Sequence, residues 1–373
     1  MKIAYFSKTS ACGPSSRYRI YQFLPYLQAA GIECSVKPLF GEQYFSLLEV
    51  RNSYLRVLGK VMYAGMRFLK RVWDLVMLGR PDLVVIEGQL FPYCPPWSER
   101  LLKWLDHKLV FEYDDAIYLT RFHRRKIPSL MLLSSAVVVG NNVLATHAKQ
   151  FAPNVTVIPT VLDTDRFIPL RFSGNGDRRG SMQPLTIVWI GLAYNFPYLD
   201  VLAPVLQRLQ LEFLARFRVV SSHPPRLAGV DVEFVPWALR TEVDSLQDCH
   251  IGVMPLPDTE WARAKCGLKL LQYMSVGMAT VASAVGANRE IITSGENGFL
   301  ASAPNEWSDH LVRLCHDVEL RTRLGEAGRR TVEERFALKI WGPRLAQTYQ
   351  TIAARTGSLE VGQSVAQSIN RCA

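Results

Sequence analysis

Short apolar runs alternate with amphipathic segments along most of the chain. Runs such as LVVIE at 83–87 and AVVVG at 136–140 are mainly β-branched and have no polar face. They are typical of strands that a parallel sheet buries on both sides. Helical stretches, the first around Arg19–Ala30, separate the runs, and this alternation predicts a doubly wound α/β fold. In the first half the expected strands span 2–7, 32–39, 83–87, 108–113, 136–140 and 155–159.

The alternation stops at 171–184, RFSGNGDRRGSMQP, and then restarts. This stretch is polar, charged and rich in glycine, as expected for a linker or an exposed loop. We therefore predict two Rossmann-like domains, 1–175 and 176–355, followed by a polar, flexible tail at 356–373. A helical segment at Phe336–Ala354 is long enough to cross back onto the first domain. In the second half the expected strands span 185–191, 217–221, 232–236, 249–256, 279–283 and 298–302.

The composition is that of a folded protein with an excess of positive charge. Hydrophobic residues make up 49% of the 373 residues and charged residues 20%, which argues against disorder. The 43 Lys and Arg exceed the 33 Asp and Glu by 10, so we expect an anionic partner. A phosphorylated substrate or an acidic membrane surface fits this charge. Nucleic acid is not expected, because the sequence contains no motif that recognises it.

The location expected from the sequence is cytoplasmic. The seven cysteines form no C-x-x-C pair and no Cys/His cluster, which favours free thiols in a reducing compartment. The first apolar run is too short for a signal peptide. No uncharged apolar run reaches the roughly 18–20 residues that a membrane span needs.

Candidate chemistry in the first half lies in loops that follow strands, where α/β proteins bind ligands. Gly13, Arg17 and Arg19 lie in SKTSACGPSSRYRI, either a loop that faces a phosphate or an acceptor, or a turn with two solvated arginines. Asp114 and Asp115 follow the fourth expected strand. Adjacent carboxylates can bind a metal, act as a base or hold hydroxyls, and the alternative is a helix cap with one solvated aspartate.

Ten positions in the second half are candidates for donor binding: Gly191, Asn195, Trp237, Asn288 and Glu290, together with Lys265, Gly267, Leu268, Lys269 and Gln272 of the segment 261–272. Gly191 permits close approach of a ligand, and Asn195 could donate to a phosphate or a sugar; the alternative is a plain turn. Trp237 either stacks on a base or is buried. Asn288 and Glu290 lie in a loop after a later strand. The carboxylate of Glu290 could hold two ribose hydroxyls, or it could simply favour the first turn of a helix.

The segment WARAKCGLKLLQ at 261–272 predicts an unusual helix start. Helical spacing begins at Gly267 and Leu268, yet no Ser, Thr, Asp or Asn stands just before them as a cap. Lys265 and Lys269 place positive charge at the end of a helix where the helix dipole disfavours it. Free N–H groups together with these cations suit a bound diphosphate.

These segments together resemble a known family. The stretch IGVMPLPDTEWARAKCGLKLLQYMSVGMATVASAVGANREIITSGENGFLA is similar to the donor-binding half of GT-B glycosyltransferases of retaining family 4, also called group 1. Looser similarity extends over GPSSRYR, EYDDAIY, VIPTVLDTDRF and IVWIGLAYNFPYL. The resemblance implies two Rossmann-like domains that face a cleft, with the acceptor on the first and the nucleotide-sugar donor on the second. It also implies transfer with retention to a glycan or lipid-linked hydroxyl, without a metal, and without a cofactor because the nucleotide-sugar is a substrate.

The sequence departs from the family pattern at several positions. Where the family carries two glutamates, this chain has Ala264 and Gln272. Asp114, with Asp115 beside it, stands at the position of the family's catalytic histidine, and Lys269 could supply phosphate-binding charge. Two alternatives follow: a catalytically silent nucleotide-sugar-binding or scaffold protein, and a sugar-nucleotide epimerase or hydrolase of the same fold. The sugar, the nucleotide, the acceptor, the linkage and the oligomeric state stay open.

Residues 54–78 predict a helix with a wide apolar arc and a narrow charged stripe. Two hypotheses arise for this helix. It could lie in a membrane interface and bring the protein to an anionic surface on the inner face of the membrane. Alternatively, it packs on the first domain and leaves the stripe in solvent. The stripe consists of Arg56, Lys60, Arg67, Lys70, Arg71 and Asp74.

Overall fold

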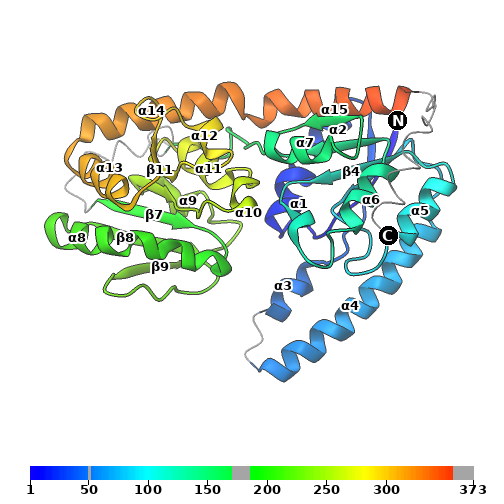
Figure 1. Ribbon diagram of the computed structural model, residues 1–373, viewed down its shortest axis with the longest axis horizontal. Coiled ribbons are helices and arrows are strands. Elements are labelled where there is room, and N and C mark those ends of the chain that lie inside the picture. Colours follow the sequence, from blue (N-terminus) through cyan, green and yellow to red (C-terminus); the bar gives the residue numbers. More distant parts are fainter. Residues whose placement is uncertain (49–51, 170–184, 356–373) are drawn as a thin grey trace.

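The chain forms two six-stranded parallel sheets covered by helices. A computed structural model describes residues 1–48, 52–169 and 185–355 (Figure 1). The strand order is β2-β1-β3-β4-β5-β6 in the first sheet and β12-β11-β10-β7-β8-β9 in the second. Every strand pair within these sheets is parallel. The predicted α/β class and its two Rossmann-like units are therefore confirmed.

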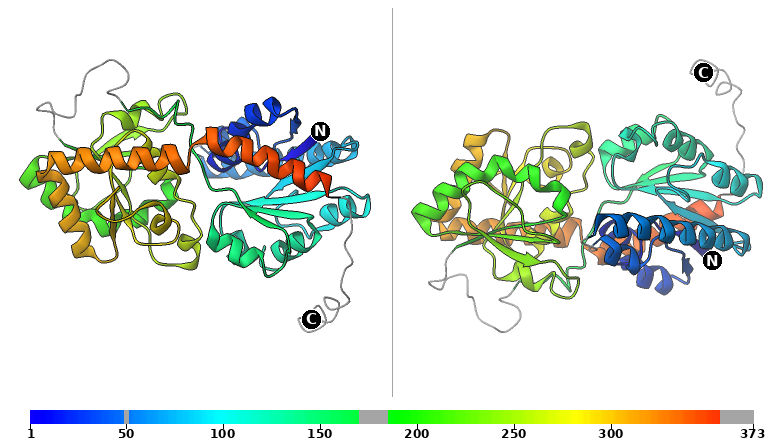
Figure 2. Two further views of the ribbon diagram at one scale, coloured as in Figure 1. Left: turned by 90° about the horizontal axis from the view of Figure 1, so that it is seen from above. Right: turned by 90° about the horizontal axis from the view of Figure 1, so that it is seen from below.

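Each expected apolar run forms a strand. Strands β3, β4, β5, β7, β10 and β11 are buried along their whole length, because helices cover both faces of each sheet (Figure 2). The first sheet contains β1 (Lys2–Phe6), β2 (Glu33–Val36), β3 (Leu83–Glu87), β4 (Leu109–Tyr113), β5 (Ala136–Val139) and β6 (Val155–Val157). The second contains β7 (Thr186–Ile190), β8 (Arg216–Ser221), β9 (Val232–Pro236), β10 (Ile251–Met254), β11 (Ala279–Ser283) and β12 (Phe299–Ala301).

The helices follow the expected alternation with one clear difference. The segment expected as one helix around 19–30 is divided, because Pro25 lies in the first turn of a new helix and has no N–H to continue an earlier one. In the first half the helices are α1 (Pro14–Arg19), η1 (Tyr21–Phe23), α2 (Leu24–Ala29), α3 (Glu42–Leu48), α4 (Ser53–Val76), α5 (Trp97–Trp104), η2 (Ile117–Leu119), α6 (Lys126–Leu133) and α7 (Asn142–Ala148). In the second they are η5 (Ala193–Leu202), α8 (Ala203–Phe213), α9 (Asp244–Gln247), α10 (Glu260–Arg263), α11 (Leu268–Ser275), α12 (Asn288–Ile291), α13 (Pro304–His316), α14 (Val318–Arg335) and α15 (Leu338–Ala354).

The last helix, α15, crosses back onto the first domain, as predicted. Its residues Leu345 and Tyr349 belong to the core cluster that contains Ile3 and Tyr5 of β1. The chain passes between the domains at Ala337, which forms an isolated parallel bridge with Leu162. In Figure 2 the helix runs along the first domain while α14 stays on the second. The boundary predicted at residue 175 and the tail at 356–373 lie outside the described residues.

Helix α4 contacts the first domain through its charged side, whereas its sequence suggests that the apolar side would be packed and the charged side exposed. Arg71 and Asp74 of the charged stripe are buried, whereas the apolar arc is exposed. Arg67 donates to the backbone oxygens of Leu39 and Pro38, and Arg71 donates to that of Ser7. The expectation of a stripe left in solvent is therefore wrong: loop carbonyls around β1 need donors, and this stripe supplies them. None of the described helices has the length and hydropathy needed to cross a bilayer.

Candidate functional site

The candidate site lies where the two domains touch, at the carboxyl ends of their strands. Asn141, after β5, donates to the backbone oxygen of Ala264 at 2.7 Å. The Cys266 thiol contacts the backbone oxygen of Asp114 at 3.2 Å. These contacts bring the loop after β4 against the segment that precedes α11. The structure thus places the Asp114–Asp115 pair beside Lys265, although about 150 residues separate them in sequence.

Asp114 is held by the first turn of α1. Ser15 lies within 2.7 and 2.8 Å of the two carboxylate oxygens of Asp114 and donates its hydroxyl proton to them. Ser15 is a residue that sequence reasoning missed. Its signal is its position just after Gly13–Pro14, where the chain enters a helix at the end of β1. The contact fixes the orientation of one carboxylate and leaves the other, on Asp115, to face the second domain.

Asp115 and two lysines form a charged group between the domains. Lys265 Nζ lies 4.0 Å from an oxygen of Asp115. Partial burial and the neighbouring Asp114 raise the pKa of Asp115 to about 6, although Lys265, Lys8 and Lys269 pull it in the opposite direction. A carboxyl with this pKa titrates close to neutral pH. Lys8, two residues after the end of β1, is a second residue that sequence reasoning did not identify.

Lys269 lies over the indole of Trp189, with its Nζ 5.3 Å from the ring centroid. Gly191 makes room for it: a Cβ at this glycine would lie 2.7 Å from the Lys269 Cε. Burial and the adjacent Lys265 lower the pKa of Lys269 to about 8, and Asp115 opposes this shift. The ammonium is therefore held close to another cation, an arrangement that a bound anion would stabilise.

The start of α11 matches the sequence prediction. Gly267 occupies the N-cap position with a φ of 72°, and no side chain caps the helix. A Cβ there would clash with Ile291, so the site requires glycine for both conformation and space. Leu268 is half-buried against the core of the second domain. The uncapped helix start and the two lysines lie on the same short segment.

Glu242, which the sequence did not single out, is the centre of a buried network between the domains. Its carboxylate accepts from Arg17 at 3.3 Å and Tyr18 at 3.1 Å, both on α1. From the second domain it accepts from the indole N–H of Trp237 and from the Gln272 amide, each at 3.2 Å. Gln272 is buried and also donates to the Tyr18 hydroxyl. The uncharged Gln272 thus lies beside a carboxylate, which Glu242 supplies.

The two arginines expected to face a phosphate have protein partners instead. Arg17 is buried and donates to Glu242 and to the backbone oxygens of Ala11 and Cys12. Arg19 is buried against Glu112 and donates to the backbone oxygen of Ile158. The alternative of two solvated arginines is therefore wrong, and the charge expected to face a phosphate is paired with buried carboxylates.

Gly13 has a packing role at this loop. A Cβ on Gly13 would lie 2.0 Å from the Thr9 hydroxyl oxygen. The loop after β1 can therefore close tightly on α1 only with glycine at this position.

The four remaining candidates have different surroundings. Asn288 is buried and donates to the backbone oxygen of Ser283, which holds the loop after β11. Glu290 is exposed and accepts from Asn142 of the first domain at 3.0 Å. Asn195 is buried with its side-chain oxygen unpartnered, beside the loop of Gly191. Trp237 is half-buried and packs beside Arg17, 5.2 Å from ring to guanidinium.

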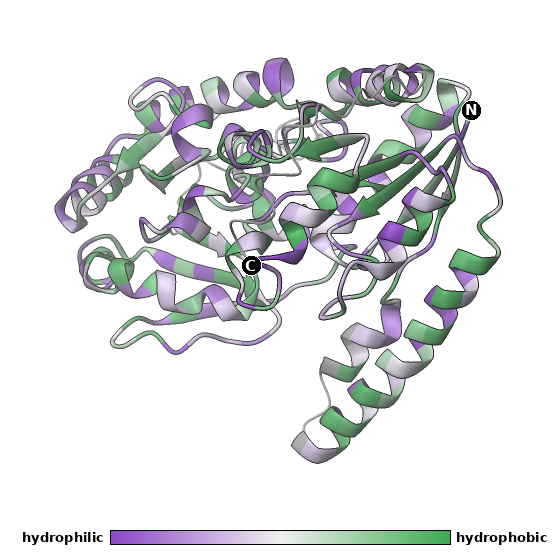
Figure 3. Cartoon of the chain, turned by 45° about the vertical axis from the view of Figure 1, so that its right-hand side comes forward, coloured by the Kyte–Doolittle hydropathy of each residue, from purple (hydrophilic) through white to green (hydrophobic). Residues whose placement is uncertain are grey.

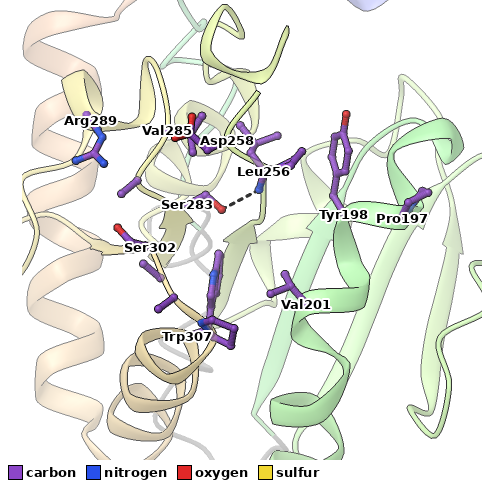
Figure 4. Close-up of a pocket in the computed structure, with 15 residues that line it drawn as sticks. Pro197, Tyr198, Val201, Leu256, Asp258, Ser283, Val285, Arg289, Ser302 and Trp307 are labelled. Atoms are coloured by element: carbon purple, nitrogen blue, oxygen red, sulfur yellow. Dashed lines mark hydrogen bonds between the residues drawn. The ribbon is translucent and has the colours of Figure 1, made fainter. Parts of the chain in front are cut away.

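A cavity of about 350 Å³ lies at the carboxyl ends of β10, β11 and β12 (Figure 4). Tyr198, Ser283 and Trp307 are among the residues that line it, and the Ser283 hydroxyl oxygen accepts from the backbone N–H of Leu256 at 2.8 Å. None of the predicted site residues lines this cavity. Among the described residues, no three His, Cys, Asp or Glu side chains are grouped as metal ligands.

Comparison with known proteins agrees with the resemblance seen in the sequence. Residues 184–317 match the family model described as glycosyl transferases group 1. Over 88 residues the chain is 31% identical to N-acetyl-alpha-D-glucosaminyl L-malate synthase of Bacillus anthracis. This similarity covers 23% of the chain and 22% of that relative.

Solved glycosyltransferase structures share the fold over nearly the whole chain. Sucrose-phosphate synthase from Thermosynechococcus elongatus superposes with a TM-score of 0.65 at 15% identity, covering 95% of this chain and all of that one. HepE of Anabaena, solved with UDP and glucose, gives a TM-score of 0.67 at 15% identity and covers 94% of this chain and all of its own. The predicted GT-B fold is confirmed.

Proposed function

We propose that this chain, whose residues 184–317 match the group 1 glycosyltransferase model, transfers a sugar from a nucleotide-sugar to a hydroxyl acceptor. The donor binds the second domain and the acceptor, a glycan or a lipid-linked molecule, approaches from the first. The observation that carries the proposal is the uncapped start of α11, with Lys265 and Lys269, placed against Asp115 of the other domain. This arrangement offers positive charge to a diphosphate and negative charge to the reacting sugar.

The diphosphate binds at Gly267, where free backbone N–H groups meet two lysines. Breaking the glycosyl–phosphate bond builds negative charge on the leaving diphosphate, and these groups stabilise that charge. Burial and the adjacent Lys265 lower the pKa of Lys269 to about 8, and a bound anion beside it favours the protonated form. Trp237 stacks on the base, while Asn195 and Glu290 contact the sugar or ribose hydroxyls.

The acceptor side contributes the two aspartates. The sugar carries positive charge in the transition state, and the ionised carboxylate of Asp115 stabilises it by attraction. Asp114, fixed by Ser15, holds an acceptor or sugar hydroxyl. The departing phosphate takes the proton of the acceptor, so the anomeric configuration is retained. The lysines and the helix start supply the charge that a metal ion would otherwise provide, and no separate cofactor takes part.

The test is a transfer and hydrolysis assay with UDP-, GDP- and ADP-sugars, starting with UDP-sugars because the HepE structure contains UDP and glucose. We expect turnover with at least one donor, unchanged by a metal chelator, and an α product from an α donor by NMR. Lys269→Ala should weaken donor binding in calorimetry, and Lys149→Ala, an exposed lysine on another helix, should not. Equal donor affinity in both variants would contradict the assigned phosphate site.

A second candidate is a protein that binds nucleotide-sugars without turnover. It is favoured by Ala264, whose side chain has no polar group, and by Gln272, whose amide donates to Glu242 and Tyr18. Tight donor binding without hydrolysis, transfer or epimerisation for every donor would support it. A sugar-nucleotide epimerase of the same fold would instead yield an epimerised donor without an acceptor.

A lipid-linked acceptor would place the protein in the cytoplasm at the inner face of the membrane.

A further inference from the structure

The outer face of α4 is a long, continuous apolar surface. The helix has 24 residues, which corresponds to about 36 Å of length. Leu69 is 74% exposed and Val76 71% exposed, and their neighbours on this face are similar. In Figures 1 and 3 the helix projects from the first domain, and Figure 3 shows hydrophobic colour over much of its length. The apolar face consists of Tyr54, Leu55, Val57, Leu58, Val61, Met62, Met66, Leu69, Val72, Trp73, Val76 and Met77.

The orientation of this helix is fixed by polar contacts to the protein. Arg71 donates to the Ser7 backbone and lies 5.0 Å from the Phe6 ring, and Tyr63 accepts from the Gly41 N–H at 2.9 Å. Asp74 is buried and paired with Lys70 at 2.9 Å. A soluble protein normally buries the apolar side of such a helix. Rotation of α4 would break these polar contacts and leave buried charged groups without partners. The contacts therefore keep the apolar face turned toward solvent.

Helix α5, which shares a core cluster with the end of α4, carries groups typical of a lipid interface. The C-terminal end of α4 and helix α5 pack on the same core cluster through Leu75 and Leu102. On α5, Trp97 and Trp104 are exposed, and exposed Arg100 and Lys103 lie on the same helix. Indole rings favour the boundary between lipid chains and water, and cations favour anionic headgroups.

We propose that the apolar face of α4 inserts into the interface of a lipid bilayer that contains anionic lipid, and that this docking orients the first domain toward the membrane. Contact is made by the apolar arc, whereas the charged stripe attaches the helix to the protein. The occupant is lipid because the surface combines apolar residues, exposed tryptophans and cations, and the whole chain has a net charge of +10. This docking does not depend on the proposed transfer reaction.

The test is co-sedimentation of the full chain with vesicles of phosphatidylcholine and phosphatidylglycerol at a 7:3 molar ratio. We expect Leu58→Glu/Leu69→Glu to lower the vesicle-bound fraction at least ten-fold, because it places carboxylates in the apolar face. The control Leu211→Glu/Val318→Glu adds the same charge at exposed positions on the second domain and should bind like the natural chain. Thermal unfolding of both variants should match the natural chain, because all four side chains are exposed.

Three results would overturn the proposal. One is a natural chain that stays in the supernatant with these vesicles, and another is equal binding by both double variants. The third is a lipid-free dimer, seen by light scattering, that Leu58→Glu/Leu69→Glu dissociates, since a second copy would then cover the face. Donor turnover with a water-soluble acceptor is measured in parallel and should not change. Loss of vesicle binding with intact turnover, or the reverse, therefore separates this proposal from the proposed reaction.

Discussion

Two pairs of cations near the domain junction differ in what surrounds them. Arg17 and Arg19 of α1 are buried and paired with Glu242 and Glu112. Lys265 and Lys269 are half-buried, and the nearest carboxylate, Asp115, lies at 4.0 Å from Lys265. The arginines, which are paired with carboxylates, stabilise the folded structure. The lysines, which among the described residues have no carboxylate closer than 4.0 Å, can pair with a ligand. A substitution in the first pair should therefore change stability, and one in the second should change binding.

The largest effect should come from Arg19→Ala. It leaves the Glu112 carboxylate buried without its cation, because burial raises the pKa of Glu112 and Arg19 is the group that opposes this shift most. Loss of one partner of a buried pair typically costs about 3–5 kcal/mol. We expect the free energy of unfolding in urea to fall by that amount. Arg208→Ala, at an exposed pair with Glu212, is the control and should change it little, and equal effects would contradict the distinction.

The next effect should come from Lys269→Met, which keeps the length of the side chain without its charge. We expect kcat/KM to fall about 100-fold, or roughly 2.7 kcal/mol, because the leaving diphosphate loses one stabilising cation. The free energy of unfolding should stay the same or rise, since burial disfavours this ammonium in the empty site. A large loss of stability with unchanged kinetics would place Lys269 with the structural arginines.

A smaller effect is expected from Glu242→Gln. The substitution keeps the shape of the side chain and removes the charge that α1 and the Gln272 amide share. Hydrogen bonds to a charged group contribute about 1.5–3 kcal/mol, and part of this should be kept by the amide. We expect an unfolding free energy lower by about 1–2 kcal/mol. Adding Arg17→Met to Glu242→Gln should then cost less than the sum of the separate changes, whereas strict additivity would argue against the network.

The smallest effect should be a pH dependence around neutrality. Asp115 must be ionised and Lys269 protonated in the proposed reaction. With pKa values of about 6 and about 8, kcat/KM should fall below pH 6 as Asp115 gains a proton, and above pH 8 as Lys269 loses one. The acidic limb should be absent in Asp115→Asn and the basic limb absent in Lys269→Met, measured on their residual activity. A limb that persists in its variant would assign it to another group.

The strands and the start of α11 were predictable because their causes are local. A run such as LVVIE is apolar along nearly its whole length, which favours burial on both faces. At Gly267 the sequence itself shows that no capping side chain precedes the helix. The division of the first helix was missed although Pro25 gave a local signal. Glu242 gave no such signal, because its partner Arg17 is 225 positions away along the chain.

The sequence by itself determined two parallel sheets, the returning C-terminal helix and a helix start without a side-chain cap at Gly267, because hydrophobic period and missing caps are properties of neighbouring residues. Only the tertiary structure decided which charges have partners. It paired Arg17 and Arg19 with distant carboxylates, left Lys265 and Lys269 beside Asp115, and turned the apolar side of α4 outward. The physical reason is that a charge or an apolar face is stabilised by what lies opposite in space, and folding alone brings those groups together.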